Sequence, residues 1–214
     1  MITTAKSQAL VPIQDIGFWT GAGLKYSLKK WEFGLKSQLR TNNNALSLDE
    51  CMAETGVNYE ISKNFSIASD FRYSYTKGGN QEFRNDLRYN LDFNYKQPFA
   101  KDFSFNLRLR YQHRFTNMFT FTPEYESDFK YRFRGRFKWN KKTHKFYSST
   151  ELFRSFTPYT KAEFDALRIV IGDKLNFNNN IIDLSLAYQR NTDNEIPFNF
   201  YFLRVIYTLN IERD

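Results

Sequence analysis

The feature that most constrains this chain is a period of two in the character of its side chains. In residues 125–139 every even position is charged, whereas six of the odd positions carry aromatic rings. Residues 103–115 repeat the pattern, with apolar side chains at six of seven odd positions and His113 as the exception. Successive side chains of a β-strand point to opposite faces, so the pattern predicts strands with one apolar face and one charged face.

The alternation recurs along the whole chain and predicts eleven strands. We expect them at residues 16–28, 31–39, 53–61, 65–75, 83–95, 103–115, 125–139, 146–156, 167–175, 182–188 and 203–211. The phase of the pattern slips near Leu152 and Phe153. Because bacterial single-chain barrels usually have an even strand count, we expect residues 3–11 to supply a twelfth strand. Ten strands is the alternative, if 146–156 is not a strand.

The connections between these strands alternate in length. Short polar connections are expected at 29–30, 62–64, 96–102, 140–145 and 176–180, and longer ones at 41–52, 76–82, 116–124, 157–164 and 191–199. Such alternation is typical of successive hairpins in an up-and-down meander. We therefore expect one domain over residues 1–214, with residues 1–14 as an N-terminal extension or an extra strand.

Composition excludes several classes of protein. Aromatic residues make up 19% of the chain and charged residues 25%, with a mean hydropathy of −0.63. A disordered chain is poor in aromatic residues, and no stretch approaches the roughly 20 apolar residues of a membrane helix. The single Cys51 excludes an internal disulfide, and with two histidines we expect no metal cluster and no cofactor.

The net charge of +8 first suggests a nucleic-acid partner. However, the basic residues alternate along strands instead of gathering on one exposed face, and no glycine-rich phosphate loop is present. We therefore expect no nucleic-acid binding.

Two architectures could hide the apolar face. A soluble sandwich or lipocalin-like barrel turns it inward, whereas a transmembrane barrel turns it outward to lipid. Strands of 13 and 15 residues greatly exceed the usual length of about 5–6, and the unequal connections resemble those of outer-membrane proteins. The sequence therefore predicts an all-β, up-and-down antiparallel transmembrane β-barrel of about 10–12 strands. Its short turns would be periplasmic and its longer loops extracellular.

Aromatic residues at both ends of the strands support a membrane-spanning barrel, because rings gather at the two membrane–water interfaces. Those beside short turns are Trp31, Tyr59, Phe65, Tyr95, Phe103, Trp139 and Phe146; those beside long loops are Tyr73, Tyr75, Phe83, Phe115 and Tyr125.

The inward face of this barrel is the candidate functional site. Its basic residues, the inward basic set, are Arg72, Arg84, Arg88, Arg108, Arg110, Arg114, Lys130, Arg132, Arg134 and Arg136, with Lys138 next in line; its acidic residues are Glu54, Glu60, Asp70, Asp86, Asp92, Glu126, Asp128 and Glu151. One interpretation is a lumen closed by cross-strand charge pairs. The other is a basic constriction that passes anions or binds an acidic ligand. The two can coexist, and Glu151 is expected to be a partner of the lumen arginines.

Catalysis is the least supported class of function. His113 lies on the lipid-facing side, where some outer-membrane lipid hydrolases place a histidine and a serine. Ser127 shares that face but would lie more than one pair away from the position opposite His113. We therefore expect an interfacial His113, a solvated His144 and no enzymatic activity.

The chain resembles a known family, the bacterial outer-membrane barrels grouped as domain of unknown function 2490. The features are Asp15-Ile-Gly-Phe-Trp-Thr followed by a hairpin at Trp31, Arg40 before the first long connection, Tyr131-Arg-Phe-Arg, Glu151-Leu-Phe, and Arg168 in a late strand. The resemblance covers nearly the whole chain. It implies a membrane barrel and brings no established activity or functional residues.

These observations set the expected location and partners. We expect an integral protein of the bacterial outer membrane, in contact with its lipid and with either a small anionic solute or another outer-membrane protein. Residues 1–11 lack the hydrophobic run of a signal peptide. Either the chain is cytoplasmic or a signal peptide has been removed and Met1 is not native, and we favour the second.

Overall fold

The computed structural model describes residues 13–77, 83–117, 126–156, 164–192 and 198–213. The described residues form strands and the connections between them, which confirms the predicted all-β fold. The strands are β1 (Ile13–Leu28), β2 (Trp31–Asn42), β3 (Ser47–Glu60), β4 (Phe65–Lys77), β5 (Phe83–Ala100), β6 (Phe103–Thr116), β7 (Glu126–Lys141), β8 (His144–Phe156), β9 (Phe164–Phe177), β10 (Asn180–Asn191) and β11 (Phe198–Arg213). None of the described segments is a helix long and apolar enough to cross a membrane.

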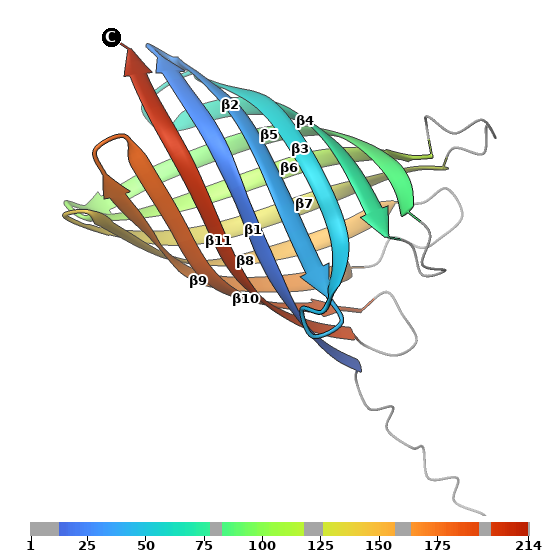
Figure 1. The fold of residues 1–214 in the computed structure, drawn as a ribbon. Coiled ribbons are helices and arrows are strands. Elements are labelled where there is room, and N and C mark those ends of the chain that lie inside the picture. Colours follow the sequence, from blue (N-terminus) through green and yellow to red (C-terminus); the bar gives the residue numbers. More distant parts are fainter. Residues whose placement is uncertain (1–12, 78–82, 118–125, 157–163, 193–197, 214) are drawn as a thin grey trace, which may run out of the picture.

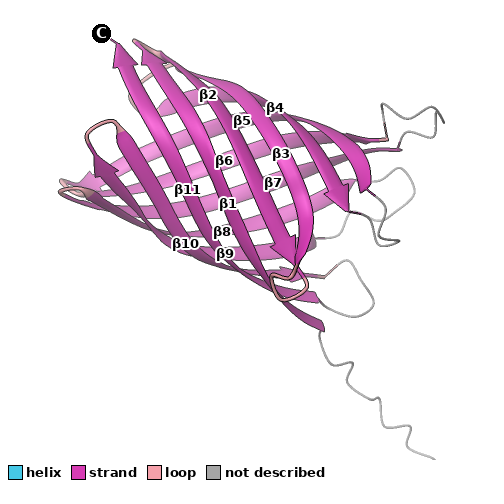
Figure 2. Ribbon diagram, in the orientation of Figure 1, coloured by secondary structure: helices cyan, strands magenta, loops and turns pink. Residues whose placement is uncertain are grey.

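The strands close into one barrel (Figures 1 and 2). Each strand pairs antiparallel with its neighbours in the chain, and the ring closes where β1 pairs parallel with β11 along their whole length. A meander with an odd number of strands must close in this way, because its first and last strands run in the same direction. The expected even count of twelve is therefore wrong for the ring formed by the described residues. The proposed extra strand at 3–11 lies outside them.

The two ends of the barrel differ in their connections. The short turns lie at the end where β11 finishes, and the longer connections lie at the opposite end (Figure 1). The predicted connections 96–102 and 140–145 contract to 101–102 and 142–143, because β5, β7 and β8 extend further than their alternation indicated.

One predicted long connection is a tight turn. The expected link 41–52 shrinks to 43–46. Asn43 and Asn44 adopt positive φ angles there, which asparagine tolerates better than most residues. Their backbone N–H groups both donate to the Asp15 carboxylate, at 2.9 and 2.7 Å. This side-chain cap replaces the longer loop that the sequence suggested.

The apolar face of the barrel points outward. Large apolar side chains such as Leu35, Phe71 and Ile171 are more than half exposed, whereas Arg110 and Asp92 are buried. The alternative in which the apolar face turns inward, as in a sandwich or lipocalin-like barrel, is therefore wrong for this chain. Alternation along each strand produces the sorting, since neighbouring residues lie on opposite sides of the wall.

Strand β8 keeps its alternation throughout, so the predicted phase slip is wrong. Leu152 is exposed on the outer face, while Tyr147, Ser149 and Glu151 are buried inside. Phe153 also faces inward, toward the central cavity. The apparent slip arose because the interior itself carries aromatic rings on this strand.

The aromatic residues predicted at the strand ends form cross-strand ring pairs on the outer face. Near the short turns, the register of the sheet joins Trp31 with Tyr59, Phe65 with Tyr95, and Trp139 with both Phe103 and Phe146. Near the long connections, the ring of Tyr75 stacks on that of Phe83, which lies two residues from its register partner Asn85. Ring centroids in these contacts lie 4.6 to 6.0 Å apart. Tyr73 and Phe115 also lie outward, whereas Tyr125 lies outside the described residues.

Candidate functional site

The interior of the barrel holds a cavity of about 680 Å³. It runs along most of the barrel, because Glu32 near the short-turn end of β2 and Asn191 at the opposite end of β10 both line it. Fifteen lysines and arginines line this central cavity, against five aspartates and glutamates.

The inward basic set is brought together in this space. Nine of its ten members line the central cavity, and they come from four consecutive strands, β4 to β7. Arg84 is the exception, since it is not part of the lining and its Nε lies 3.8 Å from Asp86.

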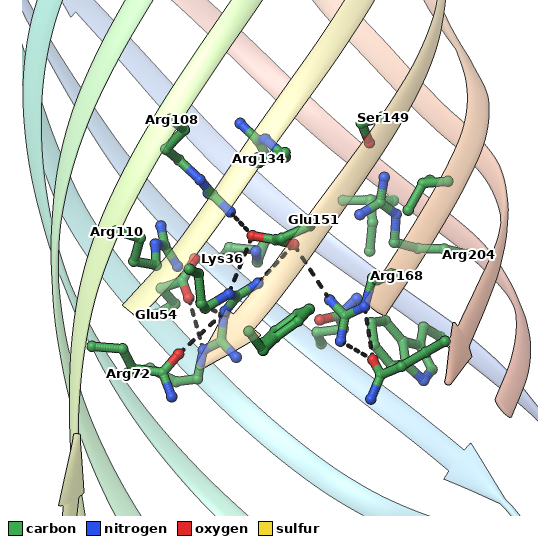
Figure 3. A pocket seen from close by; sticks show the side chains of 18 of the residues that line it. Lys36, Glu54, Arg72, Arg108, Arg110, Arg134, Ser149, Glu151, Arg168 and Arg204 are labelled. Carbon is green, nitrogen blue, oxygen red and sulfur yellow. Dashed lines mark hydrogen bonds and ion pairs between the residues drawn. The ribbon is translucent and has the colours of Figure 1, made fainter. Parts of the chain in front are cut away.

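Glu151 on β8 is the centre of a cluster of arginines (Figure 3). Its carboxylate accepts hydrogen bonds from Arg108 at 2.5 Å and from Arg132 at 3.0 Å, and Arg168 approaches it to 4.0 Å. All four side chains are largely buried. One carboxylate thus neutralises part of the charge of three guanidinium groups contributed by β6, β7 and β9.

The charge network continues from this cluster toward β2. Arg108 lies 3.6 Å from Asp92, and Arg110 bonds Asp92 at 2.6 Å and Asp70 at 2.9 Å. On the next strands Glu54 pairs with Arg72 and, at 3.1 Å, with Lys36. Buried charges are tolerated only when they are paired and hydrogen-bonded. This network supplies that pairing along the inner face of the barrel wall.

The remaining predicted acidic residues lie as follows. Asp128 pairs with Arg114, and Asp86 lies beside Arg84. Glu60 is exposed at the short-turn end and has no ion pair within the part of the chain that the structure describes. Glu126 begins β7, but its side chain lies outside the description.

Three inward arginines lack such partners. Among the described residues, no ion pair or hydrogen bond reaches the guanidinium groups of Arg88, Arg134 or Arg136, and Lys138 is likewise unpaired. Figure 3 shows Arg134 above Glu151 with no contact drawn to it. Arg136 stacks over the ring of Tyr147 at 4.5 Å, and its buried Nε has no acceptor.

The unpaired residues of β7 repel one another. Alternate residues of a strand are about 7 Å apart, so two such charges repel by roughly 2 kcal/mol at an effective dielectric constant of about 20. An anion placed between Arg134 and Arg136 would remove this repulsion.

A second cavity of about 290 Å³ lies at the short-turn end. We call it the mouth cavity; it is lined by the 62–64 turn and by residues of β2 to β7. Glu32, Arg134 and Arg136 line both cavities. The unpaired arginines therefore lie where the central cavity meets the mouth of the barrel.

An apolar patch occupies the opposite part of the interior, and the sequence reasoning missed it. Trp19 and Phe202 stack with ring centroids 3.7 Å apart, and Tyr147, Val170 and Ala187 complete the buried cluster. The sequence does carry a signal for this patch. Phe18-Trp19 and Tyr201-Phe202 each place two rings in succession, so one ring of each pair must face inward.

Inward charges on the less regular strands were also missed. Basic residues outside the predicted set that line the central cavity are Lys25, Lys36, Arg40, Lys174, Arg168 and Arg204; the additional acids are Glu32, Asp165 and Asp183. Arg40 illustrates their environment, since it pairs with Glu50 and stacks over Trp19 at 4.0 Å. The alternation along each strand could have placed these side chains inside the barrel once the pairing register of β1, β2 and β9 to β11 was known.

The histidines form no catalytic arrangement in the described residues. Phe129 lies opposite His113, and Ser127 lies opposite Phe115, so Ser127 is displaced from the imidazole along the strand. The ring of His113 packs on Phe115 instead. His144 contacts Asp173 at 2.6 Å on the outer face, and the described residues contain no group of acids, histidines and cysteine that could hold a metal.

Comparison with known proteins gives a family. No curated protein matches the chain. The model of the family described as protein of unknown function (DUF2490) matches residues 16–201, from within β1 to the beginning of β11. The chain, whose described residues form an eleven-stranded β-barrel with an arginine-rich interior, therefore belongs to the DUF2490 family.

Proposed function

We propose that this protein is an integral barrel of the bacterial outer membrane. Support comes from the apolar outer face, which would be costly in water and favourable in lipid. The ring pairs at both ends of the strands match the aromatic girdles of membrane barrels, and the unequal connections match short periplasmic turns and longer extracellular loops.

The lumen of this barrel prefers anions and acts as a small porin-like or ligand-binding channel. The observation that carries this proposal is the lining of the central cavity, in which basic residues outnumber acidic ones by fifteen to five. Arg134 and Arg136 add positive charge that no described acid neutralises where this cavity meets the mouth. Such a constriction lowers the energy of an anion and raises that of a cation.

Current through planar bilayers tests this proposal. The purified protein is inserted between two KCl solutions of unequal concentration, and the zero-current potential is measured. We expect steady conductance steps and a potential whose sign shows that chloride crosses more easily than potassium. A potential of the cation-selective sign would refute the proposal.

A plugged, accessory barrel is the second candidate, and the Glu151 network favours it. Buried pairs that link β2 to β9 through the interior would hold side chains across the lumen. Such a barrel would act through its loops or through another outer-membrane protein. It predicts no steady conductance step at any salt concentration, although the protein inserts and folds.

Folding into a membrane barrel has its own test, independent of conductance. We expect the unboiled protein to migrate differently from the boiled protein in a detergent gel, and to require detergent for solubility. A protein that remains monomeric and soluble without detergent would contradict the membrane location. Because His113 and Ser127 form no hydrogen-bonded pair, we propose no hydrolytic role.

A further inference from the structure

The mouth cavity is lined by five basic residues that form no ion pair within the described part of the chain. They are Lys63 in the turn between β3 and β4, Lys96 on β5, and Arg134, Arg136 and Lys138 on β7. No ion pair joins any of the five to another residue that the structure describes. This distinguishes the mouth cavity from the centre of the barrel, where Glu151, Asp92 and Glu54 each hold arginines.

The acidic residues of the mouth cavity do not balance this charge. Only Glu32 and Glu60 line it, and Glu32 is already paired with Lys25 at 2.5 Å. A single monovalent anion would therefore leave most of the positive charge uncompensated.

Neutral hydrogen-bonding groups complete the lining. The amides of Asn58, Asn94 and Asn106 and the hydroxyl of Ser66 border the same space. Arg136, whose buried Nε has no acceptor among the described residues, also lines this space. Arginine suits the planar geometry of carboxylate and phosphate oxygens, whereas lysine supplies a compact charge.

The cavity is large enough for a small polyvalent anion. Its volume is about 290 Å³, and each water molecule of the liquid occupies about 30 Å³. There is room for roughly ten waters, or for an anion with several charged groups and some of its hydration shell.

Lysines around the opening would raise the local concentration of anions. Four of the five short turns contain lysine, with Lys29 and Lys30 in the first, Lys63 in the second, Lys101 in the third and Lys142 in the fourth. All five are exposed. A rim of one sign of charge attracts the opposite charge before any contact is made.

We infer that the mouth cavity is a binding site for a small anion that carries two or more oxyanion groups. The inference deepens the proposed anion-preferring lumen and rests on it. Phosphate and carboxylate groups share the required chemistry, and two probes distinguish them: tripolyphosphate and citrate. The site lies at the short-turn end, so the anion is bound before it meets the paired arginines of the central cavity.

Titration calorimetry on the full chain in detergent tests the inference without requiring conductance. The mouth variant combines Lys63→Gln, Lys96→Gln and Lys138→Gln. The matched control, Lys29→Gln with Lys101→Gln and Lys142→Gln, removes the same charge from the same rim outside the cavity lining. None of these six lysines forms an ion pair in the described structure, so both variants are expected to fold, as gel mobility without boiling will show.

We expect saturable binding of at least one probe to the wild type. Charge-assisted hydrogen bonds contribute roughly tenfold each, so loss of all three lysines in the mouth variant should weaken binding roughly a thousandfold. The rim control should bind within about threefold of the wild type. Binding of only one probe would identify its group as the one recognised. Equal affinity of the two variants, or no saturable binding of either probe, would overturn the inference. Loss of anion selectivity in bilayers with binding intact would instead contradict the proposed channel.

Discussion

Arg132 and Arg134 lie two residues apart on the same face of β7, yet their surroundings differ. Arg132 donates hydrogen bonds to Glu151 and, from Nη1, to the side-chain oxygen of Gln112 at 3.2 Å. Arg134 faces Glu151 in the register of the sheet but forms no hydrogen bond with it, whereas Arg108 and Arg132 both donate to this carboxylate. One residue type on one strand is thus paired at one position and left without an ion pair at the next inward position.

The largest expected effect comes from removing the shared acid of the paired group. Glu151→Ala leaves three buried guanidinium groups without their common partner, and breaking a buried ion pair in this way costs about 3–5 kcal/mol. Denaturant unfolding of the protein folded in vesicles measures the loss. Glu60→Ala is the control, since its exposed carboxylate has no described ion pair, and it should leave the midpoint almost unchanged. Equal effects of the two variants would show that Glu151 does not stabilise the barrel.

Single substitutions sharpen the contrast between the two arginines. Arg132→Gln removes charge-assisted hydrogen bonds to Glu151 and should lower the free energy of unfolding by about 1.5–3 kcal/mol. Arg134→Gln removes repulsion from Arg108 and Arg136 that outweighs the attraction to Glu151, so its unfolding free energy should equal or exceed that of the wild type. The same unfolding experiment measures both. If Arg134→Gln destabilised the barrel as much as Arg132→Gln, Arg134 would be a structural residue as well.

Gly34 allows the open space inside the barrel to be probed with little cost in stability. A Cβ atom at Gly34 would meet nothing within 4 Å, whereas one at Gly21 would lie 2.3 Å from the Ser37 carbonyl oxygen. Gly34→Trp should therefore fold and reduce the single-channel conductance, with Gly34→Ala as its control. Gly21→Ala should destabilise the barrel by about 1–3 kcal/mol. Unchanged conductance in Gly34→Trp would mean that the path of the ions does not run beside this position on β2.

The sequence predicts the barrel because strict alternation determines the face of each side chain. Nine members of the inward basic set could be assigned to the lumen in this way, since β4 to β7 alternate with little interruption. The same reasoning failed at Trp19 and Phe202, where two adjacent rings mask the phase and the inward ring packs on a strand remote in sequence.

Side-chain pairing and the closure of the ring could not be derived from alternation. Which arginine bonds Glu151 depends on the stagger between β6, β7, β8 and β9, and Arg108 reaches it across the intervening strand. Alternation predicted the eleven strands of the ring, and the expectation of twelve was mistaken because it relied on the even count usual in bacterial barrels. Closure of the ring is a property of register and tilt, which local residue patterns do not encode.

The most direct test of the account compares zero-current potentials in a KCl gradient. Arg134→Gln with Arg136→Gln removes the two unpaired charges at the meeting point of the two cavities. Arg154→Gln with Arg190→Gln is the charge-matched control, because both arginines are exposed and neither lines a cavity. We predict that the first variant loses most of the anion preference and that the control keeps it. The same anion preference in both variants would contradict the assignment of Arg134 and Arg136 as the selectivity-determining residues.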